Sequence, residues 1–264
     1  MFNFCSLYSG STGNSSLVET SNVKILIDAG ESAKKISNAL SLYGIDLSNI
    51  DAILVTHEHI DHIKSLGTIS KKYNIPVYAN EETWAAMPEQ SKKILDECKK
   101  IYVPSTTFQI KDLKITPFKI PHDAANPCGF NIFYKRKKIS IATDLGHITE
   151  DVFHSLEKSE FALIESNYDI NTLKCSPYPY SLKQRISGPN GHLSNNTAGT
   201  LISGLMKSGL NSVILGHLSK ENNFPELAYR TVVEELINNN SDENSIHIDV
   251  AKRNTPSKLI TLED

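Results

Sequence analysis

The chain has 264 residues, of which 39% are hydrophobic and 22% are charged, as in an ordinary globular protein. No apolar run approaches the roughly 20 residues of a membrane span, and the residues from Met1 to Cys5 lack the basic and apolar segments of a secretory signal. The net charge of −3 argues against a generally basic nucleic-acid binder, although it leaves room for a local positive groove. We therefore expect a cytoplasmic protein, a single domain over residues 1–264, without membrane contact.

The first third of the chain predicts a sheet with covering helices. Strands are expected over residues 2–8, 17–20, 23–28, 53–55 and 75–79. Helices are expected over residues 31–43, where Gly44 suits a C-cap, and over 63–73. Residues 81–100 also have a mostly helical pattern, with a break or kink at Pro88. The small-residue loop from Ser9 to Ser15 allows backbone N–H groups to approach a phosphate, but a plain hairpin connection explains it equally well.

The remainder of the chain predicts a second set of strands and helices. Hairpins are expected over residues 108–120 and 129–142, and the basic tip at 135–137 of the second is more typical of a solvated turn than of a phosphate contact. Further strands are expected over residues 161–164, 212–216 and 245–250. Helices are expected over residues 149–156, 180–186, 195–207 and 225–238.

A histidine-rich stretch follows the strand at 53–55. It contains His57, His59, Asp61 and His62, so three of the nine histidines of the chain fall within six positions. In an extended backbone the rings of His57 and His59 can converge on one cation, while Asp61 and His62 can turn toward a neighbouring position. This spacing predicts a metal site, most naturally one for two metals.

Other strands end in a similar way. Asp144, Glu165 and His217 each stand at or just after the carboxyl end of a short apolar strand. A packed sheet whose strand ends converge is a rigid platform, so we expect these side chains to contribute metal ligands or acid-base groups at one edge.

With these residues in view, the sequence resembles the metallo-β-lactamase superfamily, whose H-x-H-x-D-H signature is met by His57, His59, Asp61 and His62. The resemblance implies an α/β fold, a four-layered αββα sandwich, and two divalent metal ions, Zn²⁺ or Mn²⁺. It also implies that His122 joins His57 and His59 at one metal, that His217 joins Asp61 and His62 at the other, and that Asp144 bridges the two.

His192 stands in a Gly-rich turn that opens a helix, where a histidine can meet a phosphate. This segment is similar to the histidine motif of the phosphodiesterase and nuclease branches of the superfamily, in which the histidine is paired with a carboxylate that matches Glu165. The resemblance therefore implies that His192 is a general acid or a phosphate clamp oriented by Glu165. The expected catalytic residues are Asp61, Glu165 and His192.

More narrowly, the segments at 9–15, 165–169, 191–195 and 217–223 resemble the YycJ/WalJ-like group, which is associated with 5′-to-3′ DNA exonuclease activity. The nucleic-acid substrate is then DNA rather than RNA, and local cations such as Lys183, Arg185 and Lys220 are expected to contact flanking phosphates. Further substrate-binding residues are expected in the same segments: Ser11, Thr12, Asn14, Ser194, Asn195, Ser219, Lys220 and Asn222.

Three alternatives remain open at this point. The same ligand set also suits an RNA or small-molecule phosphodiesterase, or a thioester hydrolase, because the ligands alone do not choose between carbon and phosphorus centres. Glu165 and His192 favour phosphorus. A non-catalytic binding module is disfavoured because the ligand set is complete.

Overall fold

The computed structural model describes residues 1–263, apart from the side chains of Pro88 and Ser91. The chain divides into two compact units, which we describe separately. Unit 1 comprises residues 1–117, 124–128 and 252–264, and unit 2 comprises residues 118–123 and 129–251. The sequence-based prediction of one domain stays a prediction.

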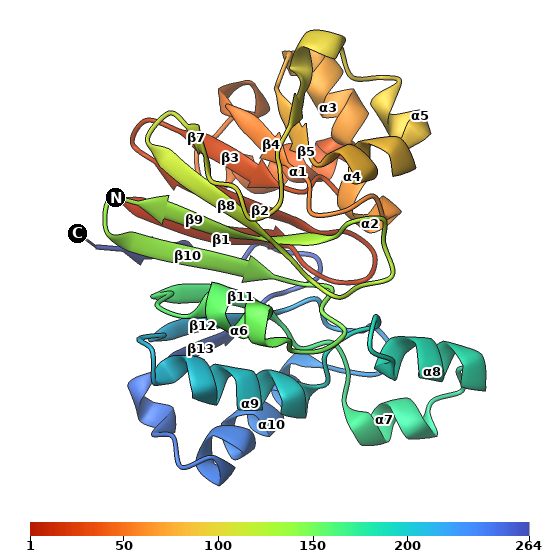
Figure 1. The fold of residues 1–264 in the computed structure, drawn as a ribbon, viewed down its shortest axis with the longest axis vertical. Helices are drawn as coiled ribbons and strands as arrows, with labels where there is room; N and C mark the ends of the chain where they lie inside the picture. Colours follow the sequence, from red (N-terminus) through yellow and green to blue (C-terminus); the bar gives the residue numbers. More distant parts are fainter. Residues whose placement is uncertain (264) are drawn as a thin grey trace. The chain divides into compact units, whose positions relative to one another are not determined.

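Unit 1 is built on a mixed sheet (Figure 1). The strand order is β14-β1-β2-β3-β4-β5-β6, antiparallel from β14 to β3 and parallel from β3 to β6. The strands are β1 (Phe2–Tyr8), β2 (Ser15–Thr20), β3 (Lys24–Ile27), β4 (Ala52–Leu54), β5 (Val77–Ala79), β6 (Lys99–Ile101) and β14 (Ile260–Leu262). The hairpin of β7 (Phe108–Ile110) and β8 (Leu113–Lys119) lies mainly in this unit.

Helices cover this sheet with apolar faces. Ile36 and Leu40 of one helix and Leu66 of another pack with strand residues such as Leu26 and Ile53. The α-helices are α1 (Ala33–Ser41), α2 (Ile60–Ile63), α3 (Leu66–Tyr73), α4 (Glu81–Ala86) and α5 (Pro88–Ser91), with short 3₁₀ turns at Leu47–Asn49 and Asp96–Cys98.

The predicted helix over residues 81–100 is wrong in its second half. The α-helical segments end at Ser91, and after the 3₁₀ turn Lys99–Ile101 forms β6, which pairs in parallel with β5 at the edge of the sheet. The reason is tertiary, because pairing with β5 outweighs the local helical preference of this lysine-rich segment.

The second mixed sheet has seven strands, in the order β13-β12-β11-β10-β9-β8-β7, of which β13 to β9 lie mainly in unit 2. β9 and β10 are antiparallel, and β10 to β13 are parallel. The strands are β9 (Cys128–Tyr134), β10 (Lys137–Ala142), β11 (Phe161–Glu165), β12 (Ser212–Gly216) and β13 (His247–Val250). The helices are α6 (Glu150–Leu156), α7 (Ile170–Cys175), α8 (Tyr180–Ser187), α9 (Asn195–Met206) and α10 (Pro225–Asn238), with a 3₁₀ turn at Glu243–Ser245.

The core of unit 2 joins its helices to the parallel strands. Leu156 of α6, Ile202 of α9 and Val232 of α10 pack with Ile164 and Leu215 of β11 and β12. Because parallel strands share one direction, their carboxyl ends lie at a common edge of the sheet. That arrangement places the ends of β10, β11 and β12 together. α7 was not predicted from the sequence.

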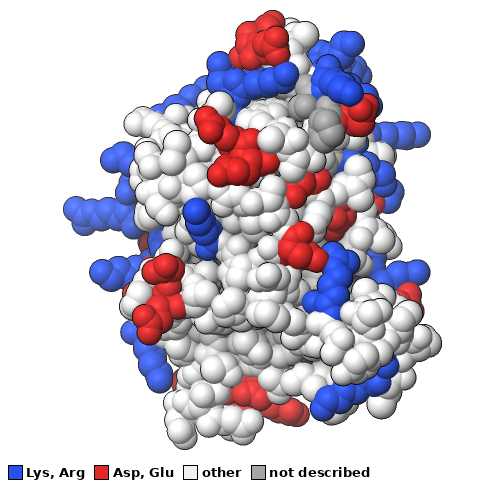
Figure 2. Space-filling view, turned by 45° about the vertical axis from the view of Figure 1, so that its right-hand side comes forward, with Lys and Arg blue, Asp and Glu red and all other residues white. Residues whose placement is uncertain are grey.

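Charge is mixed over the visible surface. On the face drawn in Figure 2, Lys and Arg are interspersed with Asp and Glu. Within the described part of the chain, no helix is long and apolar enough to cross a membrane.

Candidate functional site

The first group of candidate residues lies in unit 1, at the end of β4 and the start of α2. We call His57, His59, Asp61 and His62 the His57 cluster. His57 Nε2 is 3.0 Å from His59 Nδ1, and the rings of His57 and His62 lie 4.1 Å apart between centroids. His57 and His62 are completely buried. The convergence predicted for the two histidines of the H-x-H pair is therefore present.

Asp28 positions this cluster and was missed in the sequence analysis. It directly follows β3, and its Oδ2 lies 2.7 Å from His62 Nδ1. Asp28 also accepts hydrogen bonds of 2.9 Å from the backbone N–H and the hydroxyl of Thr56, and that hydroxyl is 3.0 Å from His57 Nδ1. The signal was available, since Asp28 ends its strand as Asp144 and Glu165 end theirs.

The loop from Ser9 to Ser15 holds Asp61. The Asn14 backbone N–H donates to Asp61 O at 2.7 Å, and Asn14 Nδ2 lies 3.3 Å from Asp61 Oδ2 and 3.1 Å from His62 Nε2. Gly30 packs so tightly here that a Cβ on it would lie 1.6 Å from Asp61 O. The position therefore requires glycine, and the loop fixes the carboxylate rather than serving as a plain connection.

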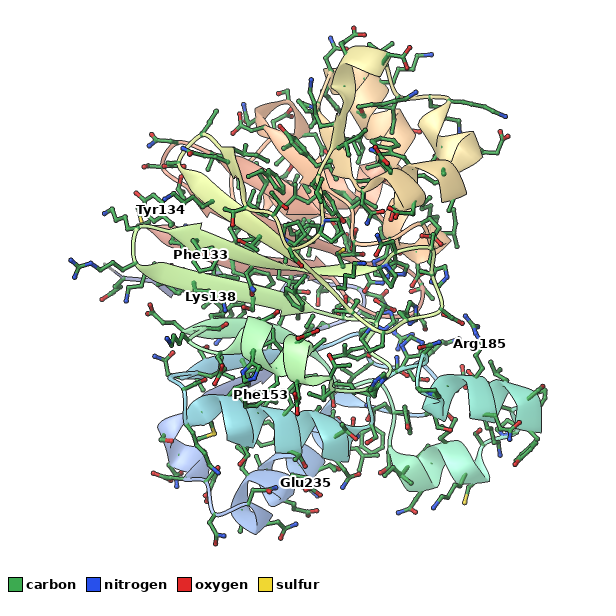
Figure 3. All side chains as sticks on the ribbon, in the orientation of Figure 1. Phe133, Tyr134, Lys138, Phe153, Arg185 and Glu235 are labelled. Atoms are coloured by element: carbon green, nitrogen blue, oxygen red, sulfur yellow. The ribbon has the colours of Figure 1, made fainter. Side chains whose placement is uncertain are left out.

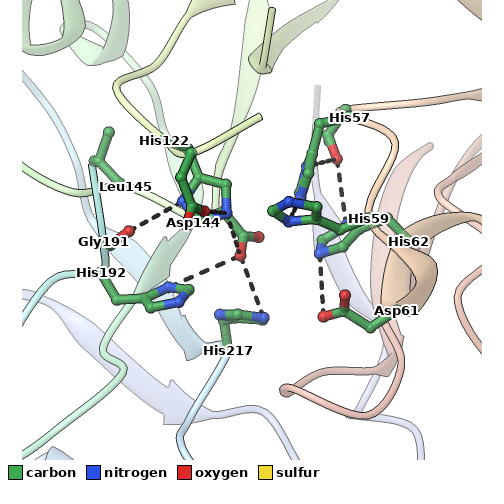
Figure 4. A network of polar contacts seen from close by, with 12 residues as sticks. His57, His59, Asp61, His62, His122, Asp144, Leu145, Gly191, His192 and His217 are labelled. Carbon is green, nitrogen blue, oxygen red and sulfur yellow. Dashed lines mark hydrogen bonds and ion pairs between the residues drawn. The ribbon is translucent and has the colours of Figure 1, made fainter. Parts of the chain in front are cut away.

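The second group lies in unit 2, at the common edge of its parallel strands. We call Asp144, Glu165, His192 and His217, with His122, the Asp144 cluster. One ligand atom from each of the first four lies within 4.8 Å of the other three. His217 Nε2 is 3.4 Å from Asp144 Oδ1, and His122 Nε2 is 3.7 Å from the same oxygen (Figure 4). The predicted convergence of strand ends is thus present.

Glu165 is the centre of this cluster. Its Oε1 lies 2.8 Å from Nδ1 of both His192 and His217. Its Oε2 accepts the backbone N–H groups of Leu145 at 2.7 Å and Leu193 at 3.1 Å. One buried carboxylate therefore orients two imidazoles and ties together three segments of chain.

The charges of this group follow from that geometry. Burial alone would raise the pKa of Glu165, but the imidazoles of His192 and His217 outweigh it and lower that pKa to about 2. Burial alone would lower the pKa of His192, but the Glu165 carboxylate outweighs it and raises that pKa above its ordinary value. The geometry therefore favours an ionised Glu165 beside a protonated His192.

His122 is held from the backbone. Its Nδ1 donates to Gly191 O at 3.0 Å, and burial lowers the pKa of this histidine. Gly191 is confined, because a Cβ on it would lie 2.2 Å from the carbonyl oxygens of Arg185 and Ile186. Both influences favour a neutral His122 that presents Nε2.

The donor set fits divalent metal ions. Asp28 fixes Nδ1 of His62, Glu165 fixes Nδ1 of His217, and the Gly191 carbonyl fixes Nδ1 of His122. Metal-binding histidines characteristically donate one ring N–H to such a carboxylate or carbonyl, which leaves the other nitrogen as the ligand. Imidazole and carboxylate together suit zinc and manganese.

Several of these residues have a strained backbone. Asp28, Asp144 and His217 have φ values of 63°, 58° and 56°. Residues other than glycine seldom adopt this left-handed conformation, which costs about 1–3 kcal/mol and persists where the surrounding structure enforces it. Each of the three directly follows a strand or lies two residues beyond it.

The predicted substrate-binding residues divide by exposure. Ser11, Thr12 and Lys220 are exposed. The others are buried and make hydrogen bonds inside the protein: Asn14, Ser194, Asn195, Ser219 and Asn222. For example, Ser194 caps α9 through Thr197 N. All eight stay predictions as substrate contacts.

Comparisons with known proteins agree with this arrangement. Residues 23–217 match the family described as the β-lactamase superfamily domain. The chain is 40% identical over 238 residues to exodeoxyribonuclease WalJ of Streptococcus pneumoniae, covering 89% of this chain and 88% of that protein. It is 35% identical over 233 residues to exodeoxyribonuclease YycJ of Bacillus anthracis, covering 88% of each chain.

Solved structures confirm the predicted α/β fold class. The metallo-β-lactamase fold protein YhfI of Bacillus subtilis matches with a TM-score of 0.73 at 15% identity, covering 97% of this chain and 99% of that chain. The short form of human tRNase Z matches with a TM-score of 0.68 at 13% identity, covering 97% and 98%. The signature residues, the matched family and the two relatives agree, so the chain belongs to the metallo-β-lactamase superfamily, in its WalJ/YycJ-like group.

Proposed function

We propose that this protein is a metal-dependent exonuclease that hydrolyses phosphodiester bonds at a DNA end, the 5′ end in particular. The observation that carries the proposal is the pair of Glu165 and His192 beside Asp144, with His192 Nδ1 2.8 Å from Glu165 and 3.8 Å from Asp144 Oδ1. The names of the two exodeoxyribonuclease relatives support DNA as the substrate.

The proposed metal ligands follow the pattern of the superfamily. His57, His59 and His122 would hold one divalent ion, Asp61, His62 and His217 would hold a second, and Asp144 would be shared. When bound, such ions activate water and stabilise the negative charge of the transition state. The support from the structure is the donor chemistry of each cluster taken by itself.

His192 has the properties of a proton donor. Hydrolysis joins a water oxygen to phosphorus and breaks the P–O bond to the leaving nucleotide, whose oxygen must gain a proton. Glu165 holds His192 at Nδ1, so Nε2–H is the proton that the ring can donate. The raised pKa of His192 favours the protonated ring near neutral pH, and Glu165 then stabilises its charge.

The preference for an end has a physical motive. The chain carries a net charge of −3, and a protein with a net negative charge gains little from contacts along a long duplex. A terminus requires only a few contacts. Ser11, Thr12 and Lys220 are exposed and available for these.

The test uses a linear DNA labelled at either end beside a covalently closed circle. We expect release of labelled nucleotides from the 5′ end and survival of the circle. Equal degradation of the circle, or shortening from the 3′ end alone, would overturn the exonuclease assignment. Faster hydrolysis of RNA or of a small phosphodiester would move the substrate to those alternatives.

The metal assignment is tested separately by elemental analysis. We expect about two equivalents of metal in the reconstituted protein and fewer after Asp144→Ala. A carefully reconstituted protein that never exceeds one equivalent contradicts the dinuclear assignment, whatever its substrate.

A further inference from the structure

The charges of the chain are unevenly distributed along unit 2. From Ile170 to Lys220 the sequence contains no Asp or Glu, although the chain has 30 of them. The same stretch contains five cations: Lys174, Lys183, Arg185, Lys207 and Lys220. The charge is thus +5 in this stretch and −8 elsewhere, which sum to the net −3. A segment that excludes carboxylates so completely is suited to a polyanion.

Part of this stretch projects as two short helices with little role in the core. We call residues 170–187, which contain α7 and α8, the α7–α8 arm (Figure 1). All eight residues of α8 are described and none of them is buried, whereas a helix normally buries one face. Tyr180, at the start of α8, is 75% exposed. Packing therefore does not explain the composition of this helix.

The side chains on α8 combine an aromatic ring with cations. Gln184 Nε2 donates to the Tyr180 hydroxyl at 3.1 Å. Lys183 Nζ donates to the carbonyl of Lys174 at 2.6 Å, which ties α8 to α7. Residues three positions apart are neighbours on a helix, so Tyr180 and Lys183 share a face. An exposed ring beside a cation is the combination that binds single-stranded nucleic acid.

The C-terminal end of the α7–α8 arm is connected to the Asp144 cluster. The backbone N–H of His192 donates to Ile186 O at 2.9 Å, so α8 leads directly to the proposed proton donor. Arg185 Nε lies 2.6 Å from Asp123 Oδ2, beside His122, and Figure 3 shows this arginine at the arm. Six residues of helix rise about 9 Å, which separates Tyr180 from Ile186 by roughly two to three stacked nucleotides.

We infer that the α7–α8 arm binds the single-stranded DNA that adjoins the scissile phosphate, with Tyr180 stacked on a base and with Lys183 and Arg185 on phosphates. This inference rests on the proposed nuclease function and names the form of its substrate. Binding at Tyr180 should not depend on the base sequence of the DNA, because every base has a face on which an aromatic ring can stack.

The first experiment measures binding and cleavage in parallel. Binding of the metal-loaded protein to a labelled single-stranded phosphorothioate oligonucleotide is followed by fluorescence anisotropy, and hydrolysis is measured on the ordinary oligonucleotide and on bis(p-nitrophenyl) phosphate. Tyr180→Ala should weaken binding and lower kcat/KM on DNA by about 5- to 100-fold, the usual effect of one stacked base. Hydrolysis of the small phosphodiester should be unchanged, because it does not reach the arm.

Two variants serve as controls. Tyr180→Phe keeps the ring and should retain nearly all the DNA affinity. Tyr229→Ala removes a tyrosine that is 44% exposed on α10, outside the acid-free stretch, and should have no effect. An unchanged affinity in Tyr180→Ala, an equal loss in Tyr229→Ala, or an equal loss on bis(p-nitrophenyl) phosphate would overturn the inference.

A second experiment tests the phosphate contacts. Lys183→Ala should reduce the slope of log Kd against log salt concentration by about 0.7, the value for one phosphate on a single strand. Lys207→Ala removes a cation of the same stretch that lies at the opposite end of α9 from His192, and it should leave the slope unchanged. Equal slopes in the two variants contradict a localised contact at the arm.

The two proposals fail in different ways. If the protein binds the oligonucleotide through Tyr180 but cleaves no DNA, the inference about the α7–α8 arm is supported and the proposed nuclease function is wrong. If it cleaves DNA with equal efficiency in Tyr180→Ala, the function stands and the arm inference is wrong.

Discussion

Each unit contains a buried carboxylate that holds histidine side chains, but the number of imidazoles around it differs. In unit 1, the buried Asp28 faces one imidazole, that of His62, and in unit 2 the buried Glu165 faces two, those of His192 and His217. Burial raises the pKa of Asp28 even though His62 and Thr56 oppose it. For Glu165 the two rings outweigh burial, and the pKa falls.

The difference shows that a second imidazole helps to lower the pKa of a buried carboxylate. Burial disfavours the charged form in both cases, so only a sufficient number of partners can reverse the balance. Asp28 is therefore suited to positioning a ligand. Glu165 is suited to positioning a ligand and to stabilising a protonated histidine as well.

We expect the largest effect from a substitution of Glu165. Glu165→Gln removes the charge shared by two rings, so we expect activity to fall by roughly 10²–10⁴-fold and metal affinity to fall by roughly 10- to 100-fold. Excess metal should restore only part of the activity. Glu160→Gln, just before the same strand, is the control. Full recovery in excess metal would show that Glu165 acts only on a ligand.

A substitution of His192 distinguishes the two roles of Glu165, which are to position the proposed ligand His217 and to stabilise a protonated His192. His192→Ala should leave the metal content intact, because the proposed ligand positions are filled by other residues, while activity falls by roughly 10²–10⁴-fold. Elemental analysis and turnover on DNA measure the two effects. A loss of metal in this variant would make His192 a ligand instead.

Asp28 only positions the proposed ligand His62, so its substitution should affect metal binding alone. Asp28→Asn leaves His62 without its carboxylate partner, so metal affinity should fall by roughly 10- to 100-fold. Activity should recover in excess metal, unlike that of Glu165→Gln. Titration of both variants with metal compares them directly. If Asp28→Asn stays inactive at saturating metal, the two carboxylates do not differ in role.

Gly30 probes the packing behind the His57 cluster. Gly30→Ala forces a Cβ against Asp61 O, so we expect a loss of about 1–3 kcal/mol in the free energy of unfolding and weaker metal binding. Gly44→Ala is the control. Gly44 has a φ of 70° and no neighbouring atom within 4 Å of the added Cβ, so backbone strain alone should cost about 1–2 kcal/mol. Metal binding should be weakened only in Gly30→Ala.

The last effect concerns a buried cation away from both clusters. Lys138 Nζ donates to the carbonyls of Ser155 and Glu157, and Figure 3 shows it on β10. Burial lowers the pKa of Lys138 from its ordinary value of 10.5 to about 8. The unfolded chain therefore binds this proton more tightly, and the burial cost is present below pH 8 and relieved as pH rises to about 10.5.

Chemical denaturation of the wild type and of Lys138→Met at pH 7.5 and pH 10 measures this effect. The wild type should gain stability relative to the variant at the higher pH. A constant difference in unfolding free energy between the two proteins contradicts the lowered pKa.

Much of the fold and most of the site could be predicted from the sequence because the signals are local. His57 to His62 are contiguous, and Asp144, Glu165 and His217 follow strands with clear apolar patterns. β6 could not be predicted, because its pairing with β5 is a tertiary contact that competes with helical periodicity.

The buried polar side chains mark another limit. Asn195 starts α9 after a polar turn and Asn222 stands in a polar turn, positions typical of exposed substrate contacts, yet both are completely buried. Asn195 accepts from Ser166, far away in the sequence. Burial of a turn depends on elements that pack over it, and no local pattern reports them.

The hydrogen bonds of the two carboxylate oxygens of Glu165 restrict the opening of the loops around it. Oε2 binds the amides of Leu145 and Leu193 while Oε1 binds His192 and His217, so three loops meet at a single side chain. None of the three can open without breaking contacts that the others share. We therefore expect the amides around Leu145 and Leu193 to exchange their hydrogens at a common rate, although 48 positions separate them in the chain.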